Sequence, residues 1–274
     1  MTFFGTKRTA AALGPLLVIL VLAAGCGKKT VEIAPDMASS DEALYKMGEQ
    51  TIKKDAEKGI LYLRQVIDSF PKSFYAQRAK ILIADAYFRK GDESNMILAA
   101  AEYREFIRTY PYSPSAAYSQ YQVAMTFHKK ILKPGRDQSK TIQALAEFKK
   151  VITDYPASDQ AKAAQEKIKD CEERLASHNA EIAISYCKRR AYRAAISRLT
   201  EIMTTYPEYS RLDEVYFYLG ESHFLMNLLD QAVPYFTKVV TDYPGKGLAK
   251  EATKRLSEIG NRKAAQKAVP DKKD

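Results

Sequence analysis

A proline follows an aromatic residue at five places in this chain, and the residues upstream of each proline are alike. Eight residues before each proline is a large, mainly apolar side chain, and twelve before is Gly or Ala. Residues four apart share one face of a helix, and proline disfavours helical geometry in the residue before it. The pattern therefore predicts five helices that stop at the aromatic residues Phe70, Tyr110, Tyr155, Tyr206 and Tyr243.

The last of these five segments identifies the type of repeat. Residues Asp213–Pro244 follow the spacing of the tetratricopeptide signature W-x2-L-G-x2-Y…A-x3-F…P, with Tyr216 at the Trp position and His223 at the Tyr position. The segment before it, from about Ala176 to Pro207, has the same intervals. We therefore expect an all-α chain, a tetratricopeptide-repeat superhelix of about five helix-turn-helix units in which each unit packs only on its neighbours.

Unequal spacing between the prolines divides the array. The third unit contains an insertion, Leu132–Ser139, whose Pro-Gly step predicts an exposed loop. An amphipathic segment, Asp159–Leu175, lies between the third and fourth units and predicts a bridging helix. The expected divisions are units one to three at 40–156, the bridging helix at 157–175, units four and five with a capping helix at 176–260, and a basic, disordered tail at 261–274.

The N-terminus has the features of an export signal. Lys7 and Arg8 precede an apolar run, Ala10–Ala24, and Cys26 follows Ala-Gly as it does in a bacterial lipobox. We expect a lipoprotein signal peptide at 1–25, acylation of Cys26 and a flexible tether at 26–39, because several acyl chains are needed for stable anchoring. An ordinary signal peptide with an incidental cysteine is the alternative. Gly27 stands where enteric lipoproteins retained in the inner membrane have Asp, so we expect delivery to the outer membrane.

Basic residues outnumber acidic ones, with 43 Lys and Arg against 33 Asp and Glu. This excess favours acidic partners or anionic lipid headgroups, although part of it belongs to solvated helix faces and to the tail. Nucleic acid is not expected as a partner, because an exported lipoprotein does not meet it.

No arrangement of residues predicts catalysis, a metal site or a cofactor. Cys171 and Cys187 are expected on successive helices that flank a turn near Ser177–Asn179, and we favour two buried thiols over a disulfide. The three histidines have no cysteine or carboxylate at a spacing typical of a triad or a zinc site. His223 is expected to be a packing residue, and we expect that the protein is not an enzyme.

Three segments resemble the BamD family, the lipoproteins of the β-barrel assembly machinery. Leu175–Arg198 is similar to the family pattern LA-x-HE-x3-A-x-YYLKRGAY-x-AA-x-R, with Arg190 in place of the Gly. Arg136–Gln138 resembles its DRD segment, and Ser69–Ala76 resembles its RYPFGPY motif, with Lys72-Ser73 in place of FG.

This resemblance implies a non-enzymatic scaffold on the periplasmic face of the outer membrane. Its partners would be a BamA-type outer-membrane protein, other Bam lipoproteins and unfolded outer-membrane protein substrates. It implies that Arg198 pairs with an acidic residue of the BamA-type partner. It also implies that Phe70 and Tyr75 lie near a groove that receives the C-terminal strand of the substrate.

Two other functions remain open from the sequence. One is the Tol-Pal-associated coordinator of envelope constriction, whose family typically has a coiled coil before its repeats, whereas no heptads precede Ser40 here. The other is a regulatory scaffold for polysaccharide export or peptidoglycan enzymes. The partner recovered in a pull-down would separate these three functions.

Overall fold

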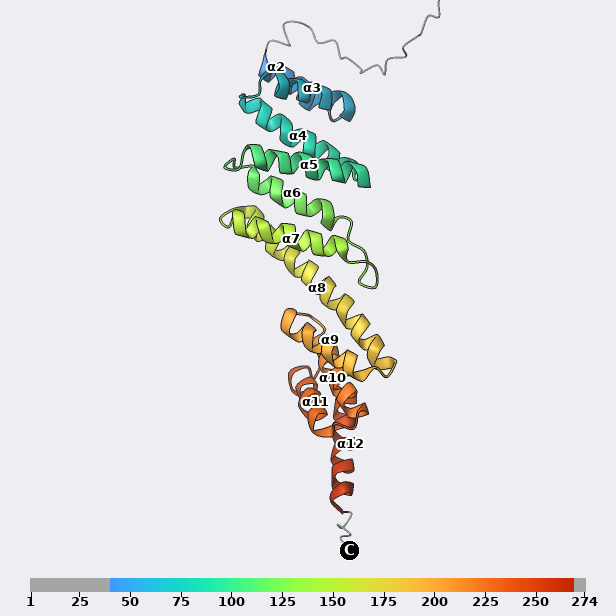
Figure 1. The fold of residues 1–274 in the computed structure, drawn as a ribbon. Coiled ribbons are helices and arrows are strands. Elements are labelled where there is room, and N and C mark those ends of the chain that lie inside the picture. Colours follow the sequence, from blue (N-terminus) through green and yellow to red (C-terminus); the bar gives the residue numbers. More distant parts are fainter. Residues whose placement is uncertain (1–39, 269–274) are drawn as a thin grey trace, which may run out of the picture.

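The computed structural model describes residues 40–268, and these form helices and connecting turns only. The helices stack in chain order into one elongated array, with α2 at one end and α12 at the other (Figure 1). The tetratricopeptide-repeat fold is therefore confirmed. The signal peptide at 1–25, Cys26 and the tether at 26–39 lie outside the described residues. The helices are α2 (Asp41–Thr51), α3 (Ala56–Ser69), α4 (Phe74–Lys90), α5 (Glu93–Thr109), α6 (Ala116–His128), α7 (Ser139–Asp154), α8 (Asp159–Lys188), α9 (Tyr192–Thr205), α10 (Leu212–Leu225), α11 (Leu229–Asp242) and α12 (Ala249–Ala268).

All five aromatic residues that precede a proline terminate a helix, as predicted. Each is the C-cap residue of its helix, with φ between −135° and −129° and ψ between 45° and 65°. Each donates its backbone N–H to the carbonyl four residues earlier, so the helix closes normally before the chain leaves it. At the other ends, Ser or Asp side chains cap five helices, at Ser40, Asp55, Ser73, Asp92 and Ser158.

The small and large residues of the repeat meet between the two helices of each unit. The side chains eight residues before the prolines are fully buried: Leu63, Tyr103, Phe148, Leu199 and Phe236. A Cβ on Gly220 would lie 2.7 Å from the Phe236 ring, and a Cβ on Gly48 would lie 2.7 Å from Leu63. Gly48 therefore performs the packing role of the signature glycine although it is one residue out of register. Close approach of the helices requires a residue without a side chain at both places.

The turn expected near Ser177–Asn179 is absent, because α8 is one continuous helix of 30 residues. The segment contains no Gly or Pro and is rich in good helix formers, so nothing in it stops the helix. The bridging helix and the first helix of unit four are thus the same element. Cys171 and Cys187 lie about 24 Å apart along its axis, too far for a disulfide. Both are free and buried, which confirms the favoured interpretation.

The real turn follows at residues 189–191. Arg190 has φ of 64°, in the left-handed region that glycine adopts most readily. Asn227 occupies the same region, with φ of 60°, in the turn between α10 and α11. An Arg there is more strained than an Asn, because only the short polar side chain of Asn offsets part of the steric cost.

Helix α12 closes the array and continues past the expected boundary. It runs to Ala268, so the expectation of disorder from residue 261 is wrong for 261–268, and 269–274 lie outside the described residues. Arg255 and Arg262 lie on the ring of Phe224, at 4.7 and 4.5 Å from its centroid, and Arg255 also bonds to Glu221. Across the described part of the chain, no helix combines the length and hydropathy of a membrane span.

Candidate functional site

The insertion between α6 and α7 is an ordered loop because a buried amide holds it. Gln138 is 5% exposed, and its Nε2 donates to the carbonyls of Lys133, at 2.9 Å, and Arg136, at 3.0 Å. Thr141 donates its hydroxyl to Gln138 Oε1 at 2.7 Å. The loop thus surrounds one buried side chain, which sequence analysis did not single out. Its only sequence signal was a polar residue just before a helix.

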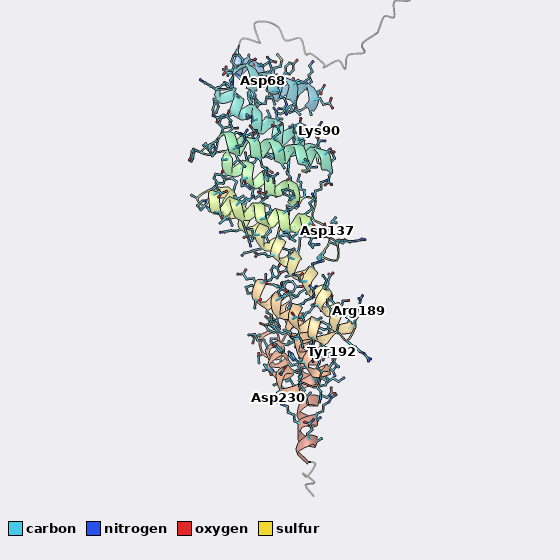
Figure 2. All side chains as sticks on the ribbon, viewed as in Figure 1. Asp68, Lys90, Asp137, Arg189, Tyr192 and Asp230 are labelled. Carbon is cyan, nitrogen blue, oxygen red and sulfur yellow. The ribbon has the colours of Figure 1, made fainter. Side chains whose placement is uncertain are left out.

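This insertion loop packs on the second half of α8. His178 donates from Nδ1 to the carbonyl of Pro134 at 2.5 Å, and a Cβ on Gly135 would lie 3.3 Å from Glu181. Figure 2 places Asp137 of the loop and Arg189 on the same side of the array. Between loop and helix is a cleft of about 300 Å³, the α8 cleft, lined by Gly135, His178, Glu181, Ile182, Ser185, Tyr186 and Arg189.

A series of ion pairs joins the second helices of successive units on the outer face. Arg64 of unit one pairs with Glu102 of unit two, and Arg104 of unit two pairs with Glu147 of unit three at 2.9 Å. The basic partner stands seven residues before its proline and the acidic partner nine before. Burial of Glu147 opposes ionisation, but Arg104, Gln120 and Lys150 together hold its pKa below the usual value.

Arg198 interrupts this series. It stands nine residues before its proline, the position that Glu102 and Glu147 occupy in units two and three. The basic residue that would face it from unit three is Lys149, which instead pairs with Glu172 of α8 at 3.2 Å. Arg198 thus replaces an acid at a position that forms pairs between units.

The Arg198 side chain is exposed and rests on an aromatic ring. Its guanidinium carbon lies 5.5 Å from the centroid of Tyr186, which also lines the α8 cleft. Among residues 40–266, whose side chains the structure describes, no carboxylate lies within ion-pair distance of it. The arrangement holds a cation in place on a ring without neutralising it.

The predicted groove residues Phe70 and Tyr75 pack against one core cluster at the N-terminal end, and both are only partly buried. Tyr75 lies 5.3 Å from Tyr45 and 5.9 Å from Phe74, measured between ring centroids. Phe74 is 66% exposed, so it offers more apolar surface to a ligand than either predicted residue. The sequence signal for Phe74 was available, since it directly follows the N-cap Ser73 on the first turn of α4.

A cation completes this aromatic group. The Arg78 guanidinium lies 5.0 Å from the Tyr45 centroid and 5.8 Å from that of Phe74. The group therefore combines exposed aromatic surface with a positive charge, which suits an aromatic-ended peptide that carries a carboxylate.

One histidine has a carboxylate partner that sequence spacing did not reveal. His128 Nε2 lies 2.9 Å from Asp170 Oδ2, across 42 residues of sequence, and ties α6 to α8. Burial opposes ionisation of Asp170, but His128 and Arg174 keep its pKa below the usual value. The neighbouring thiol is not activated, because burial raises the pKa of Cys171 to about 12. His223 stacks on Tyr235 as a packing residue, as expected.

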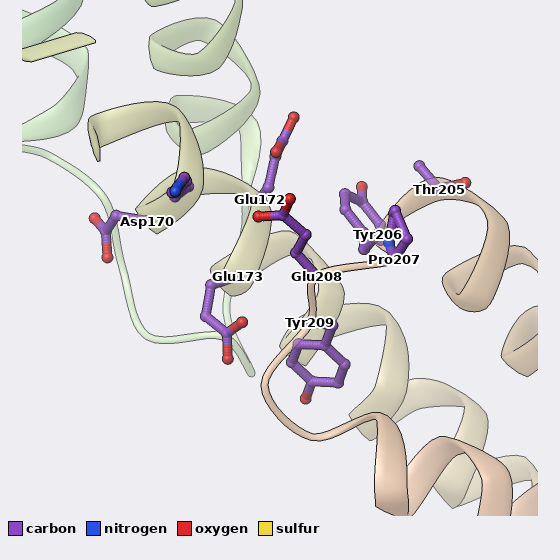
Figure 3. A pocket seen from close by; sticks show the side chains of 9 residues that line it. Asp170, Glu172, Glu173, Thr205, Tyr206, Pro207, Glu208 and Tyr209 are labelled. Carbon is purple, nitrogen blue, oxygen red and sulfur yellow. The ribbon is translucent and has the colours of Figure 1, made fainter. Parts of the chain in front are cut away.

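A larger cleft, of about 580 Å³, lies between α8 and the loop from α9 to α10 (Figure 3). Three of its four acidic side chains, Asp170, Glu172 and Glu173, already have structural partners. Glu173 accepts hydrogen bonds from the backbone and side chain of Ser210, and Glu172 pairs with Lys149. In the part of the chain that the structure describes, no three His, Cys, Asp or Glu gather as a metal site would require.

The family model and the curated relatives indicate one family. The model of the YfiO family, described as outer membrane lipoprotein, matches residues 37–233. The outer membrane protein assembly factor BamD of Caulobacter vibrioides is 26% identical over 260 residues, which cover 94% of this chain and 84% of that protein. The protein of that name in Rickettsia prowazekii is 27% identical over 237 residues, covering 85% and 91%. Among solved structures, the TPR2AB domain of yeast Sti1 in a pHSP90 complex aligns with a TM-score of 0.40 at 14% identity, covering 85% and 96%.

Proposed function

Because this chain belongs to the YfiO family of outer membrane lipoproteins, we propose that it is a non-enzymatic scaffold for the assembly of outer membrane proteins. The names of its relatives support this role, since they are outer membrane protein assembly factors. The scaffold works from the periplasmic face of the outer membrane, where it docks a BamA-type barrel protein at one end and an unfolded substrate at the other. Other lipoproteins of the assembly machinery complete the complex.

Membrane attachment rests on Cys26. The mature chain would begin at this residue, and a diacylglycerol thioether plus an amide-linked chain would anchor it. The sequence around the cysteine supports this proposal. Mass spectrometry of the N-terminal peptide from membrane-extracted protein reads the acyl chains directly, and an unmodified Cys26 would contradict the anchor.

The observation that carries the docking proposal is the charge of Arg198. It stands at the inter-unit pairing position, rests on Tyr186 and has no carboxylate among the described residues. A guanidinium held in place in this way gains most from a carboxylate supplied from outside, because its orientation is already fixed. We therefore assign it to an ion pair with an acidic residue of the barrel protein.

Replacing Arg198 with Glu tests this assignment. We expect co-purification of the barrel protein from detergent-solubilised membranes to fall by about tenfold or more, since a close interfacial charge pair becomes a repulsion. Arg193→Glu is the matched control, because Arg193 is exposed on the same helix, α9, and we expect near-normal recovery. Equal losses in the two variants, or no loss in Arg198→Glu, would remove Arg198 from the interface.

Tyr45, Phe74, Tyr75 and Arg78 form the N-terminal aromatic group, which we assign to binding of the substrate. Phe74, Tyr75 and the neighbouring Phe70 offer stacking surface, and Arg78 offers a charge for a C-terminal carboxylate. We expect Phe74→Ala to weaken binding of a peptide that ends in Phe by roughly fivefold to tenfold, because Phe74 contributes most of the exposed aromatic area. Fluorescence anisotropy measures this, with Tyr112→Ala as the control at an exposed tyrosine elsewhere. A peptide that binds both variants equally would place the substrate elsewhere.

A further inference from the structure

One repeat position differs in chemistry between the units. Fourteen residues before the proline, units two and three have Ile97 and Ile142, whereas the other units have a charged residue, Glu57, Arg193 or Asp230. Ile97 is 65% exposed and Ile142 is 57% exposed. Exposed helix positions usually have charged or polar side chains. Units two and three therefore have apolar surface where the other units have solvated, charged side chains.

Ile97 lies on the rim of a groove that is separate from the α8 cleft and from the N-terminal aromatic group. This groove, the unit two–three groove, has a volume of about 230 Å³ and lies between α5, the end of α6 and the start of α7. Met96, Ala100 and Phe127 line it as apolar surface, together with Ile97. The groove thus continues inward from an exposed isoleucine to buried apolar side chains.

The charged residues of this groove are mainly basic. Arg104 and Lys140 lie 5.7 and 5.6 Å from the Phe127 centroid, and Lys130 is the third cation. The only acid in the lining is Glu93, whose carboxylate is 3.7 Å from Lys140.

Lys130 is the cation with most charge to offer a ligand. It donates to the Gly91 carbonyl at 2.8 Å and meets no carboxylate among the described side chains, whereas Arg104 is paired with Glu147. The segment from Lys129 to Arg136 adds further basic residues beside it and contains no acid. The local charge therefore complements a negatively charged ligand.

We propose that the unit two–three groove is a docking surface for a polypeptide segment in which apolar side chains alternate with carboxylates. Apolar residues of the segment would cover Ile97 and the apolar lining beneath it, and its carboxylates would meet Lys130 and its basic neighbours. The proposal goes beyond the proposed function, because it uses neither Arg198 nor the N-terminal aromatic group. A tetratricopeptide array offers several faces, so a third ligand can bind without displacing the other two.

The test uses the purified mature protein and two fluorescein-labelled peptides. In one peptide leucines alternate with glutamate and serine, and in the other lysine replaces each glutamate. We expect the acidic peptide to bind at least about tenfold more tightly than the basic one in fluorescence anisotropy. Ile97→Ser should weaken its binding by about fivefold to tenfold, and Lys130→Glu by about tenfold. Glu57→Ser, at the equivalent position of unit one, should leave it unchanged.

Each other outcome contradicts the proposal. Equal affinity for the two peptides would mean that charge does not select the ligand, and equal affinity of the Ile97→Ser variant and wild type would place binding elsewhere. A change in sedimentation of the Ile97→Ser variant without a change in peptide affinity would identify the face as a contact between copies of this chain. Circular dichroism melts of all variants confirm that each remains folded.

Discussion

The two halves of the array have the same apolar frame and different outer faces. In units one to three, ion pairs link the second helices, from Arg64 to Glu102 and from Arg104 to Glu147. In units four and five the corresponding basic positions are Thr200 and Thr237, and Arg198 replaces the acid. At these positions the first half therefore pairs its charges between units, whereas the second half leaves the charge of Arg198 for a partner. The second half follows the repeat signature most strictly at its apolar positions, yet it lacks the ion pairs of the first half. The apolar packing and the charges on the outer face therefore vary independently.

The largest expected effect tests whether the halves are independent in stability. Phe236→Ala and Phe148→Ala each leave a cavity at a fully buried position. Each should lower the local free energy of unfolding by about 3–5 kcal/mol. Because each repeat contacts only its neighbours, Phe236→Ala should increase hydrogen exchange in α10–α12 and leave α2–α5 unchanged. Phe148→Ala should increase it in α6–α8 and leave α2, α3, α11 and α12 unchanged. Hydrogen exchange read by mass spectrometry measures this. Faster exchange throughout the chain in either variant would show that the array unfolds as one unit.

A smaller effect tests the ion pairs of the first half. Arg104→Ala should lower the free energy of unfolding by roughly 1 kcal/mol at neutral pH, since Glu147 keeps Gln120 and Lys150 as partners. The pKa of Glu147 is lower in the folded state than in the unfolded state. The ionised Glu147 therefore stabilises the fold at pH values above its unfolded-state pKa, and this stabilisation is lost as the pH falls through its folded-state pKa. The difference in unfolding free energy between wild type and Arg104→Ala should therefore be largest near pH 7 and should shrink below about pH 4.3.

Urea unfolding at several pH values measures that difference. Thr200→Ala, at the equivalent position of unit four, is the control and should show no such pH dependence. A deficit of Arg104→Ala that stays constant down to pH 3 would mean that the arginine stabilises by packing and not by charge.

The smallest effect concerns the junction between the halves. Arg190→Gly should stabilise the chain by about 0.5–1 kcal/mol, because relief of left-handed strain exceeds the added entropy of the unfolded glycine. Asn227→Gly, at a similar φ in the second half, should change stability by only a few tenths of that, since Asn tolerates this region. Thermal melts compare the two variants. A destabilised Arg190→Gly would indicate that the Arg190 side chain makes a compensating contact.

Much of the fold could be predicted because the same spacing of apolar residues and proline occurs in five repeats. The helix ends at Phe70 and Tyr206 and the packing at Leu63 and Phe236 follow from spacing alone. The continuity of α8 could not be predicted from spacing, because the repeat pattern predicts the start of a new unit, and hence a turn, near Ala176. The true turn was hidden since an Arg occupies the left-handed position where a glycine would have marked it.

The sites were less predictable because they depend on pairs that are distant in sequence. Arg198 was named from a resemblance, but its unpaired state becomes visible only when the partners of Glu102 and Glu147 are known. The link between His128 and Asp170 spans 42 residues and has no local signal. Gln138 is a polar residue in a loop by sequence, and only the structure shows that the loop is built around it.

The length of α8 sets the angle between the two ends of the protein. One helix of 30 residues belongs to both halves, so a single inserted residue would turn the second half by about 100° about the helix axis and move it by about 1.5 Å along it. The surface that carries Arg198 would then face a different direction relative to the surface that carries Phe74. Natural variation in this family should therefore tolerate substitution along α8 much more readily than a change in its length. Insertions should be found instead in the loop between α6 and α7.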